Sequence, residues 1–341
     1  MFTIFSTSLT LALSVFVIIL LAVLLGKAGF ISEIVDSGLM WLMVNVLFPC
    51  LIFDRIIRAD IFSDLRNVWL PPFLGFFLTF IGVGIGFFVA LNFSSRLTGL
   101  STWRSKRTFA ASVGILNYGF IPIPLVSVLF PDDDRTMGVL FLQYIGSEFS
   151  IWTLIIFCLY GRFDKWSLLR LINMPIIAIF AAVLLNLLWG SSILSEEMRL
   201  SLRLFDFLFD GRCGAIHLLG VSAVPISLLV VGLTISRLLA FEDIKLRWHR
   251  TWRTSICSVV IRLFIMPLII FLIMILIPCT LEIKRILIIY GAMNSAVLTV
   301  ALAKNYGGCE KTALDTIMSN SILSIITIPI WISLGFYILS L

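Results

Sequence analysis

Charged residues are scarce in this chain. They make up 13% of its 341 residues, whereas hydrophobic residues make up 60%, and the mean hydropathy is +1.11. A soluble globular protein of this length carries about one quarter charged residues and about one half apolar residues. The composition therefore excludes a soluble globular fold and predicts a polytopic membrane protein.

Residues that carry chemistry are equally sparse. The two histidines, His217 and His249, are far apart in the sequence, and the six cysteines form no Cys-x-x-Cys motif. Gly82, Gly84 and Gly86 lie in an apolar run, which predicts close helix packing rather than a phosphate-binding loop. The chain also lacks a Walker lysine motif and a set of nucleophile, base and orienting residue. We therefore expect no enzymatic activity, metal site, cofactor or nucleic-acid partner.

Ten apolar runs are long enough to cross a bilayer, which takes about 20 residues for a helix. They cover residues 4–25, 37–57, 69–92, 107–130, 136–160, 171–189, 216–238, 252–278, 286–304 and 314–340. The sequence therefore predicts an all-α fold of ten transmembrane helices. Residues 195–209 mix charged and apolar side chains at helical spacing, which predicts a further helix on the outer membrane surface.

Basic residues give the orientation of these helices. The net charge of +6 is distributed unevenly, because loops after odd-numbered runs carry more Lys and Arg than loops after even-numbered runs. Positive loops favour the cytoplasm. We therefore expect an integral protein of the plasma membrane or the bacterial inner membrane, with both termini outside the cytoplasm.

The fourth run cannot form a regular helix. Pro122 and Pro124 each remove a backbone donor, Gly114 and Gly119 loosen the backbone, and Asn117 carries an amide to mid-membrane depth. Irregular backbone at this depth normally lines a cavity, because its polar groups need partners. The stretch from residue 114 to 125 is therefore a binding-site hypothesis.

An internal repeat relates the two halves of the chain. A shift of 177 residues places Asn117 on Asn294 and Gln143 on Asn320. Five helices followed by five would insert the second half, residues 166–341, upside down relative to the first, residues 1–165. Inverted repeats of this kind are typical of transporters with a midplane substrate site.

Several separated stretches resemble the auxin efflux carrier family. They are the turn that begins at Gly26, Leu219 to Thr234, and the carboxy-terminal stretches Ala301 to Gly308 and Ser321 to Trp331. The resemblance implies helices 1, 2, 6 and 7 as a scaffold with the homodimer contact, and helices 3–5 and 8–10 as a moving transport domain. It also implies broken, crossing helices 4 and 9.

Two positions depart from the family pattern. Pro122 stands where the family commonly has Gly, and Asn294 follows Met293 where the family commonly has a helix-breaking Pro. The sequence thus predicts the break in the fourth helix and leaves the break in the ninth open, with Gly291, Asn294 and Ser295 as the residues that can produce it.

The candidate substrate-binding residues follow from the crossover. Asn117 is expected to donate its amide to a substrate carboxylate, with capping of the broken helix as the alternative. For Asn294 the alternative is an interhelical hydrogen bond. The remaining candidates are Tyr118, Gly119, Pro122, Pro124, Gln143, Ser147, Ser295 and Asn320.

Glu148 and Arg262 are ionisable residues placed near the midplane, where such groups cost several kcal/mol and tend to mark transport pathways. One interpretation is a buried ion pair that joins two helices. In a second, Arg262 attracts an anion while Glu148 couples a proton to transport. In a third, Arg262 extends toward the cytoplasmic side.

Together these observations predict a secondary efflux carrier for small organic anions, namely carboxylates such as auxin-like acids or malonate, that works by alternating access. One alternative is a sodium-coupled symporter of the bile-acid type. The other is a membrane receptor or scaffold that binds such an anion without moving it.

Overall fold

The computed structural model describes residues 2–59, 64–93, 98–161, 169–189, 214–240 and 244–339, and these residues contain helices but no β-strand. The surface helix expected over residues 195–209 lies outside this part of the chain. Ile, Leu, Val and Phe dominate the helices. Hydrogen bonds within each helix satisfy the polar backbone, as a lipid environment requires. The all-α prediction is confirmed.

Each of the ten predicted runs coincides with helix. The first half contains α1 (Phe2–Lys27), α2 (Glu33–Leu42) with the π-turn η1 (Met43–Leu47) and α3 (Phe48–Arg58), α4 (Arg66–Asn92), the pair α6 (Trp103–Gly114) and α7 (Pro122–Leu129), and α8 (Asp134–Ser150) continued by η3 (Ile151–Ile155) and α9 (Ile156–Tyr160). The second half contains η4 (Leu169–Leu171), α11 (Met174–Trp189), α14 (Ala215–Ala240), α15 (Ile244–Val260) continued by η6 (Ile261–Ile265) and α16 (Met266–Leu276), the pair α17 (Leu281–Ala292) and α18 (Leu298–Asn305), and α19 (Glu310–Leu339).

Length and hydropathy identify membrane-crossing candidates among these helices. In the described residues, 6 helical segments qualify: Glu33–Arg58, Arg66–Asn92, Asp134–Tyr160, Ala215–Arg237, Thr251–Leu276 and Glu310–Leu339. Large apolar side chains such as Leu20, Phe80 and Leu272 are exposed on the outside of the fold. An apolar exterior of this kind suits lipid rather than water.

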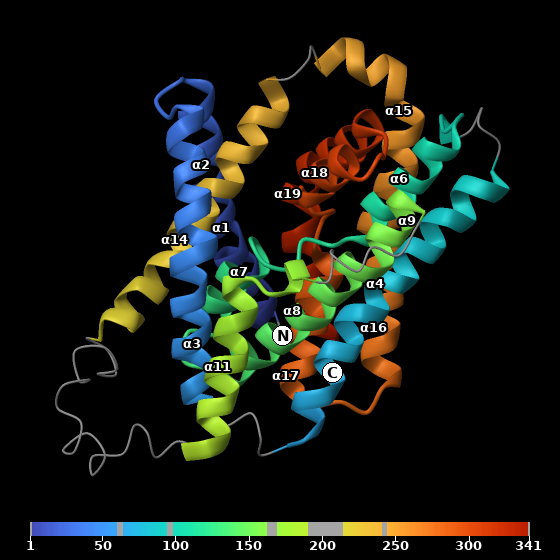
Figure 1. The fold of residues 1–341 in the computed structure, drawn as a ribbon. Helices are drawn as coiled ribbons and strands as arrows, with labels where there is room; N and C mark the ends of the chain where they lie inside the picture. Colours follow the sequence, from blue (N-terminus) through green and yellow to red (C-terminus); the bar gives the residue numbers. More distant parts are fainter. Residues whose placement is uncertain are drawn as a thin grey trace.

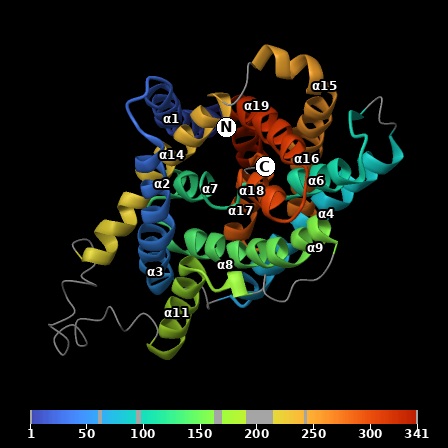
Figure 2. The same ribbon diagram turned by 45° about the horizontal axis from the view of Figure 1, so that its top comes forward.

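The helices pack in two groups that Figures 1 and 2 show side by side. In one group α1 packs along α14, and α3 packs along α11 and α14. In the other, α4 packs against α6 and α8, while α19 packs against α15, α17 and α6. Contacts of α1 with α19 and of α3 with α8 join the groups.

Glycines permit the closest helix contacts in the second group. A Cβ atom on Gly146 of α8 would lie 1.8 Å from the carbonyl oxygen of Pro72 in α4, and one on Gly82 would lie 2.9 Å from Cα of Gly114 in α6. Gly86 makes a similar contact with α6. The prediction of close packing was wrong for Gly84, which has nothing within 4 Å of a Cβ atom because it lies on another face of α4.

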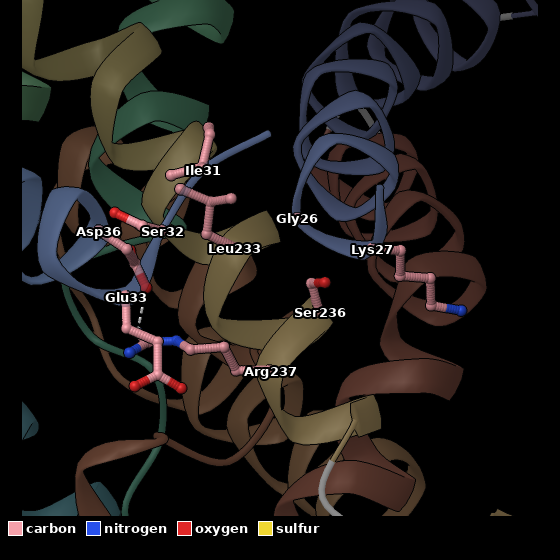
Figure 3. Close-up of a pocket in the computed structure, with 9 residues that line it drawn as sticks. All are labelled: Gly26, Lys27, Ile31, Ser32, Glu33, Asp36, Leu233, Ser236 and Arg237. Atoms are coloured by element: carbon pink, nitrogen blue, oxygen red, sulfur yellow. Dashed lines mark ion pairs between the residues drawn. The ribbon is translucent and has the colours of Figure 1, made fainter. Parts of the chain in front are cut away.

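A pocket of about 290 Å³ lies where the turn between α1 and α2 meets α14 (Figure 3). The buried Asp36 of α2 forms an ion pair there with the partly exposed Arg237 of α14. None of the residues that line this pocket belongs to the α6–α7 or α17–α18 segments. The pocket therefore lies within the first helix group, between α1, α2 and α14.

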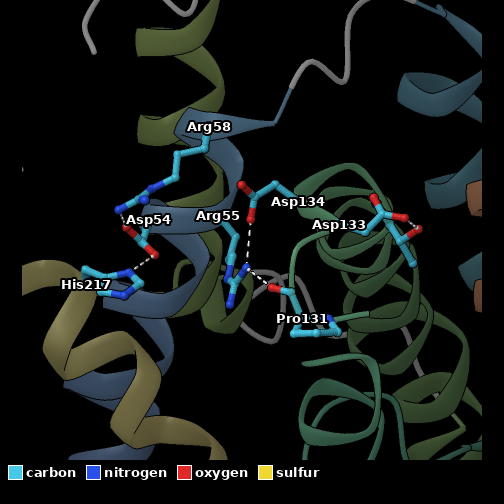
Figure 4. A network of polar contacts seen from close by, with 8 residues as sticks. Asp54, Arg55, Arg58, Pro131, Asp133, Asp134 and His217 are labelled. Atoms are coloured by element: carbon cyan, nitrogen blue, oxygen red, sulfur yellow. Dashed lines mark hydrogen bonds and ion pairs between the residues drawn. The ribbon is translucent and has the colours of Figure 1, made fainter. Parts of the chain in front are cut away.

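An ion pair ties the two helix groups together at one end of the fold (Figure 4). Nη1 of Arg55 in α3 donates to Oδ1 of Asp134 over 2.8 Å and to the carbonyl oxygen of Pro131 over 3.0 Å. On the same helix, Asp54 lies 2.9 Å from Nδ1 of His217 in α14. Thus α3 is linked both to its neighbour α14 and to the start of α8.

Candidate functional site

The two interrupted helices meet at their breaks. The backbone N–H of Asn117 donates to the carbonyl oxygen of Asn294 over 2.8 Å, and the N–H of Ala296 donates to the carbonyl oxygen of Ile115 over 3.0 Å. Leu116 and Ser295 form the antiparallel bridge between these bonds. Backbone groups that the breaks remove from helical bonding are therefore partly satisfied across the crossover.

Prolines define the break in the fourth run. The helix α6 ends at Gly114, Ile115 is extended (φ −77°, ψ 111°), and α7 begins at Pro122. A proline in the first turn of a helix costs little, because its missing N–H would have no intrahelical acceptor there. Pro122 and Pro124 thus act as residues that start α7, and the predicted break is confirmed.

The ninth run is also broken, which answers the question that the missing proline left open. The helix α17 ends at Ala292, Met293 is extended (φ −70°, ψ 144°), and α18 begins at Leu298. Nε of Arg262 donates to the carbonyl oxygen of Met293 over 2.9 Å, and the carbonyl oxygen of Asn294 accepts from Asn117. Hydrogen bonds from outside the helix therefore hold open a break that the family makes with proline.

Side chains of α19 brace the second break. Nδ2 of Asn294 donates to Oγ of Ser321 over 3.1 Å, and Nδ2 of Asn320 donates to Oγ of Ser295 over 2.9 Å. The interhelical hydrogen bond considered for Asn294 is thus present, although in an interrupted helix. Oδ1 of Asn294 and Oδ1 of Asn320 are buried without a hydrogen-bond partner in the structure. Both carbonyl groups remain free acceptors.

The side chain of Asn117 behaves differently from that of its repeat mate. It is 8% exposed and makes no hydrogen bond with any residue in the described part of the chain. The alternative in which this amide caps the broken helix was therefore wrong, because the side chain bonds to neither the end of α6 nor the start of α7. The Asn117 amide keeps both its donor and its acceptor atoms for a ligand.

Tyr118 is held from both ends. Its hydroxyl donates to Oε1 of Glu148 over 2.8 Å, and its carbonyl oxygen accepts from the hydroxyl of Tyr290 over 3.2 Å. Nε1 of Trp152 donates to Oε2 of Glu148 over 2.8 Å. The Tyr118 ring also packs edge-on against Tyr144, with centroids 5.0 Å apart. Glu148 therefore links the first break to α8, the helix on which it lies, and does not pair with Arg262.

The interpretation in which Glu148 and Arg262 form an ion pair was wrong. The Glu148 carboxylate is bound by Tyr118 and Trp152, whereas Arg262 reaches the carbonyl oxygen of Met293. Arg262 is fully buried, so extension of its side chain to the membrane surface is also excluded. Both residues are buried, but they contact different breaks.

Three other predicted lining residues, Gln143, Ser147 and Gly119, have few contacts with the two breaks. Gln143 is fully buried on α8, and neither atom of its amide has a hydrogen-bond partner among the residues described. The Ser147 hydroxyl bonds within its own helix, to the carbonyl oxygen of Gln143 at 3.3 Å. Gly119 lies in the turn before α7, where an added Cβ would meet the Tyr144 ring at 3.5 Å.

Three residues of the site escaped the sequence reasoning: Ser321, Trp152 and Tyr290. Each contributes one polar side-chain atom to the contacts of the two breaks. Ser321 opens one of the stretches that resemble the auxin efflux carriers, so position in that stretch was a usable signal. Trp152 lies four residues after Glu148, at the spacing of one helical face, which was a second signal.

Comparisons with known proteins agree with a transporter. A family model described as a membrane transport protein matches residues 7–167 and 175–332, which include both breaks. An uncharacterized transporter from Methanothermobacter thermautotrophicus is 24% identical over 329 residues, which cover 96% of this chain and 98% of that protein.

Proposed function

Because the chain belongs to the membrane transport protein family, which includes the auxin efflux carriers, we propose that it is a secondary carrier that exports small organic anions. Carboxylates such as indole acids or malonate are the proposed substrates. The membrane class follows from the family and from the apolar helices. The side chains at the crossover support the proposed substrate class.

The observation that carries this proposal is the free Asn117 amide beside a crossover whose backbone is already paired. The backbone N–H groups of Asn117 and Ala296 donate across the break. The Asn117 side chain makes no hydrogen bond with the described residues, so it is available to a substrate. An amide N–H binds a carboxylate oxygen without the desolvation cost of a buried charge. Half-helix ends at such crossovers add partial charges that favour ions.

We propose ten transmembrane segments arranged as two inverted repeats, residues 1–165 and 166–341. The contact between Asn117 and Asn294 supports this arrangement, because the shift of 177 residues relates these two positions and they meet at the crossover. The distribution of Lys and Arg supports termini outside the cytoplasm.

The proposed mechanism is alternating access by movement of one helix group against the other. The group that contains α1, α3, α11 and α14 would serve as scaffold and homodimer contact, and the group that contains both breaks would carry the substrate. Support comes from the packing, since α4, α6, α8, α17 and α19 contact one another and surround the crossover. The link from Arg55 to Asp134 would then have to open during transport.

Transport in liposomes tests the proposal. The purified protein is reconstituted, and flux of labelled indole-3-acetate and labelled malonate is measured with and without a proton gradient, in sodium and in potassium buffers. Saturable flux of either acid, inhibited by the unlabelled acid, is the expected result. Flux that requires sodium would favour the bile-acid type of symporter, and saturable binding without flux would favour a receptor.

A further inference from the structure

Arg262 is the buried cation beside the second break. It lies in the π-turn η6, its residue is 0% exposed, and its Nε donates to the carbonyl oxygen of Met293. A guanidinium has five N–H donors. The bond to Met293 uses one of them, and both terminal nitrogens, Nη1 and Nη2, are buried without a hydrogen-bond partner in the described structure.

The stabilisation that Arg262 gains by capping α17 offsets only part of the free-energy cost of burying its charge. A cation at a helix C-terminus gains a small stabilisation from the helix dipole. Burial of an ion without a counterion costs considerably more than this gain. Glu148 does not supply the counterion, because its oxygens accept from Tyr118 and Trp152. A neutral donor such as glutamine would cap Met293 at lower cost, so the positive charge itself needs a reason.

The position of the guanidinium supplies that reason. Met293 directly precedes Asn294, whose backbone pairs with Asn117, so Arg262 lies next to the crossover on the side of the ninth helix. The two terminal nitrogens form a planar fork that matches the two oxygens of a carboxylate. An anion at the crossover would therefore meet the Asn117 amide at the first break and the guanidinium of Arg262, which approaches the second break from η6.

Resting on the transport function proposed above, we propose that Arg262 binds the carboxylate of the substrate at the crossover through Nη1 and Nη2, while its Nε keeps the ninth helix open. Among the residues with described burial, Arg262 is the only buried Lys or Arg. A second carboxylate on the same substrate would have no such partner. Of the two substrates proposed above, the site thus favours the indole acid, with its one carboxylate and uncharged remainder, over the dicarboxylate malonate.

Binding of an acid and of its neutral amide tests the assignment. Affinities of the full-length protein for indole-3-acetate and indole-3-acetamide are measured by scintillation proximity, together with thermal stability. The wild type is expected to bind the acid at least about tenfold more tightly than the amide. In Arg262→Gln the affinity for the acid should fall about ten- to hundredfold, since hydrogen bonds to a charged group are lost, and affinity for the amide should change little.

Two further variants keep the test interpretable. Arg262→Lys retains the charge without the fork and should show an intermediate acid preference, and it replaces the glutamine variant if that protein does not fold. Arg285→Gln, which removes an arginine from the outer ion pair with Asp133, should leave both affinities unchanged.

Three outcomes would overturn the assignment. The first is an equal loss of acid and amide binding in Arg262→Gln, which would show a purely structural role. The second is an unchanged acid preference in that variant. The third is a wild-type protein with no preference for the acid. Failure of the proposed transport function is a separate result, seen as absence of flux in a protein that binds the acid through Arg262.

Discussion

The hydroxyl of Tyr118 lies 2.8 Å from Oε1 of Glu148, which ties the first break of the crossover to α8. Since the Trp152 indole donates to the second oxygen, both oxygens act as acceptors, the role that a carboxylate fills best. In Glu148→Gln an amide NH₂ group would face one of these two donors. We expect lower thermal stability and a flux of indole-3-acetate that falls by the same factor at pH 6 and pH 8.

Glu310→Gln, a change of an exposed residue in the first turn of α19, is the matched control and should alter neither quantity. A flux that loses its pH dependence in Glu148→Gln would contradict the structural role. It would instead support the interpretation in which this residue couples a proton to transport.

Two asparagines in this chain should respond to the same substitution in opposite ways. The Asn117 amide has no hydrogen-bond partner among the described residues, so Asn117→Ala should leave the melting temperature nearly unchanged and reduce flux about tenfold or more, because a hydrogen bond to a charged group is lost. Asn186 donates to the carbonyl oxygens of Ile56, Ile57 and Ala59 at the end of α3.

Asn186→Ala leaves these buried carbonyl groups without their donor, which costs about 1–3 kcal/mol. That variant should melt earlier and keep the substrate affinity of the wild type. Normal flux in Asn117→Ala would argue against the substrate contact.

Two glycine substitutions, one in α4 and one in the neighbouring α8, distinguish the effect of a close helix contact from that of intrinsic helix propensity. Gly146→Ala places a methyl group into the carbonyl of Pro72, so α4 and α8 must move apart, at a cost of about 1–3 kcal/mol or more. Gly84→Ala meets nothing within 4 Å, and alanine favours the helix. Thermal unfolding in detergent should show a marked loss for the first variant and none for the second; equal effects would disprove the close contact.

The ion pair between Arg55 and Asp134 should limit motion more than it stabilises the fold. Its side chains are 15% and 28% exposed, and partly exposed pairs contribute about 0.2–1 kcal/mol. Arg55→Ala should therefore change the melting temperature little and raise the maximal flux by up to about fivefold, if opening of this pair limits the cycle. Arg66→Ala removes a pair with Asp64 that lies within one turn and should leave flux unchanged.

Most of the fold was predicted from the apolar composition and from the conformational restrictions of proline. The runs of apolar residues located the helices, and Pro122 located the first break, because both effects are local in sequence. The second break was not predictable from local sequence, since Asn294 does not forbid a helix. It depends on Arg262 and on the backbone of Asn117, which approach from distant parts of the chain.

Side-chain pairing was the part of the site that sequence could not provide. Helix depth placed Glu148 and Arg262 near the same level, but depth gives no information on the rotation of each helix about its axis. In the structure that rotation turns Glu148 toward Tyr118 and Arg262 toward Met293. Met293 is an apolar residue that accepts from Arg262 through its backbone, so nothing in the sequence marks it as a partner.

The pairing of the two breaks also has a consequence for biosynthesis. Asn117 and Ala296 exchange hydrogen bonds with chain segments that are synthesised far apart in time, so the N–H of Asn117 has no acceptor at the crossover until the ninth helix has been inserted. Long-range contacts of this kind form late and slow the approach to the native state. The crossover is therefore among the last parts of the protein to mature, and a chain released after its first half contains only one side of it.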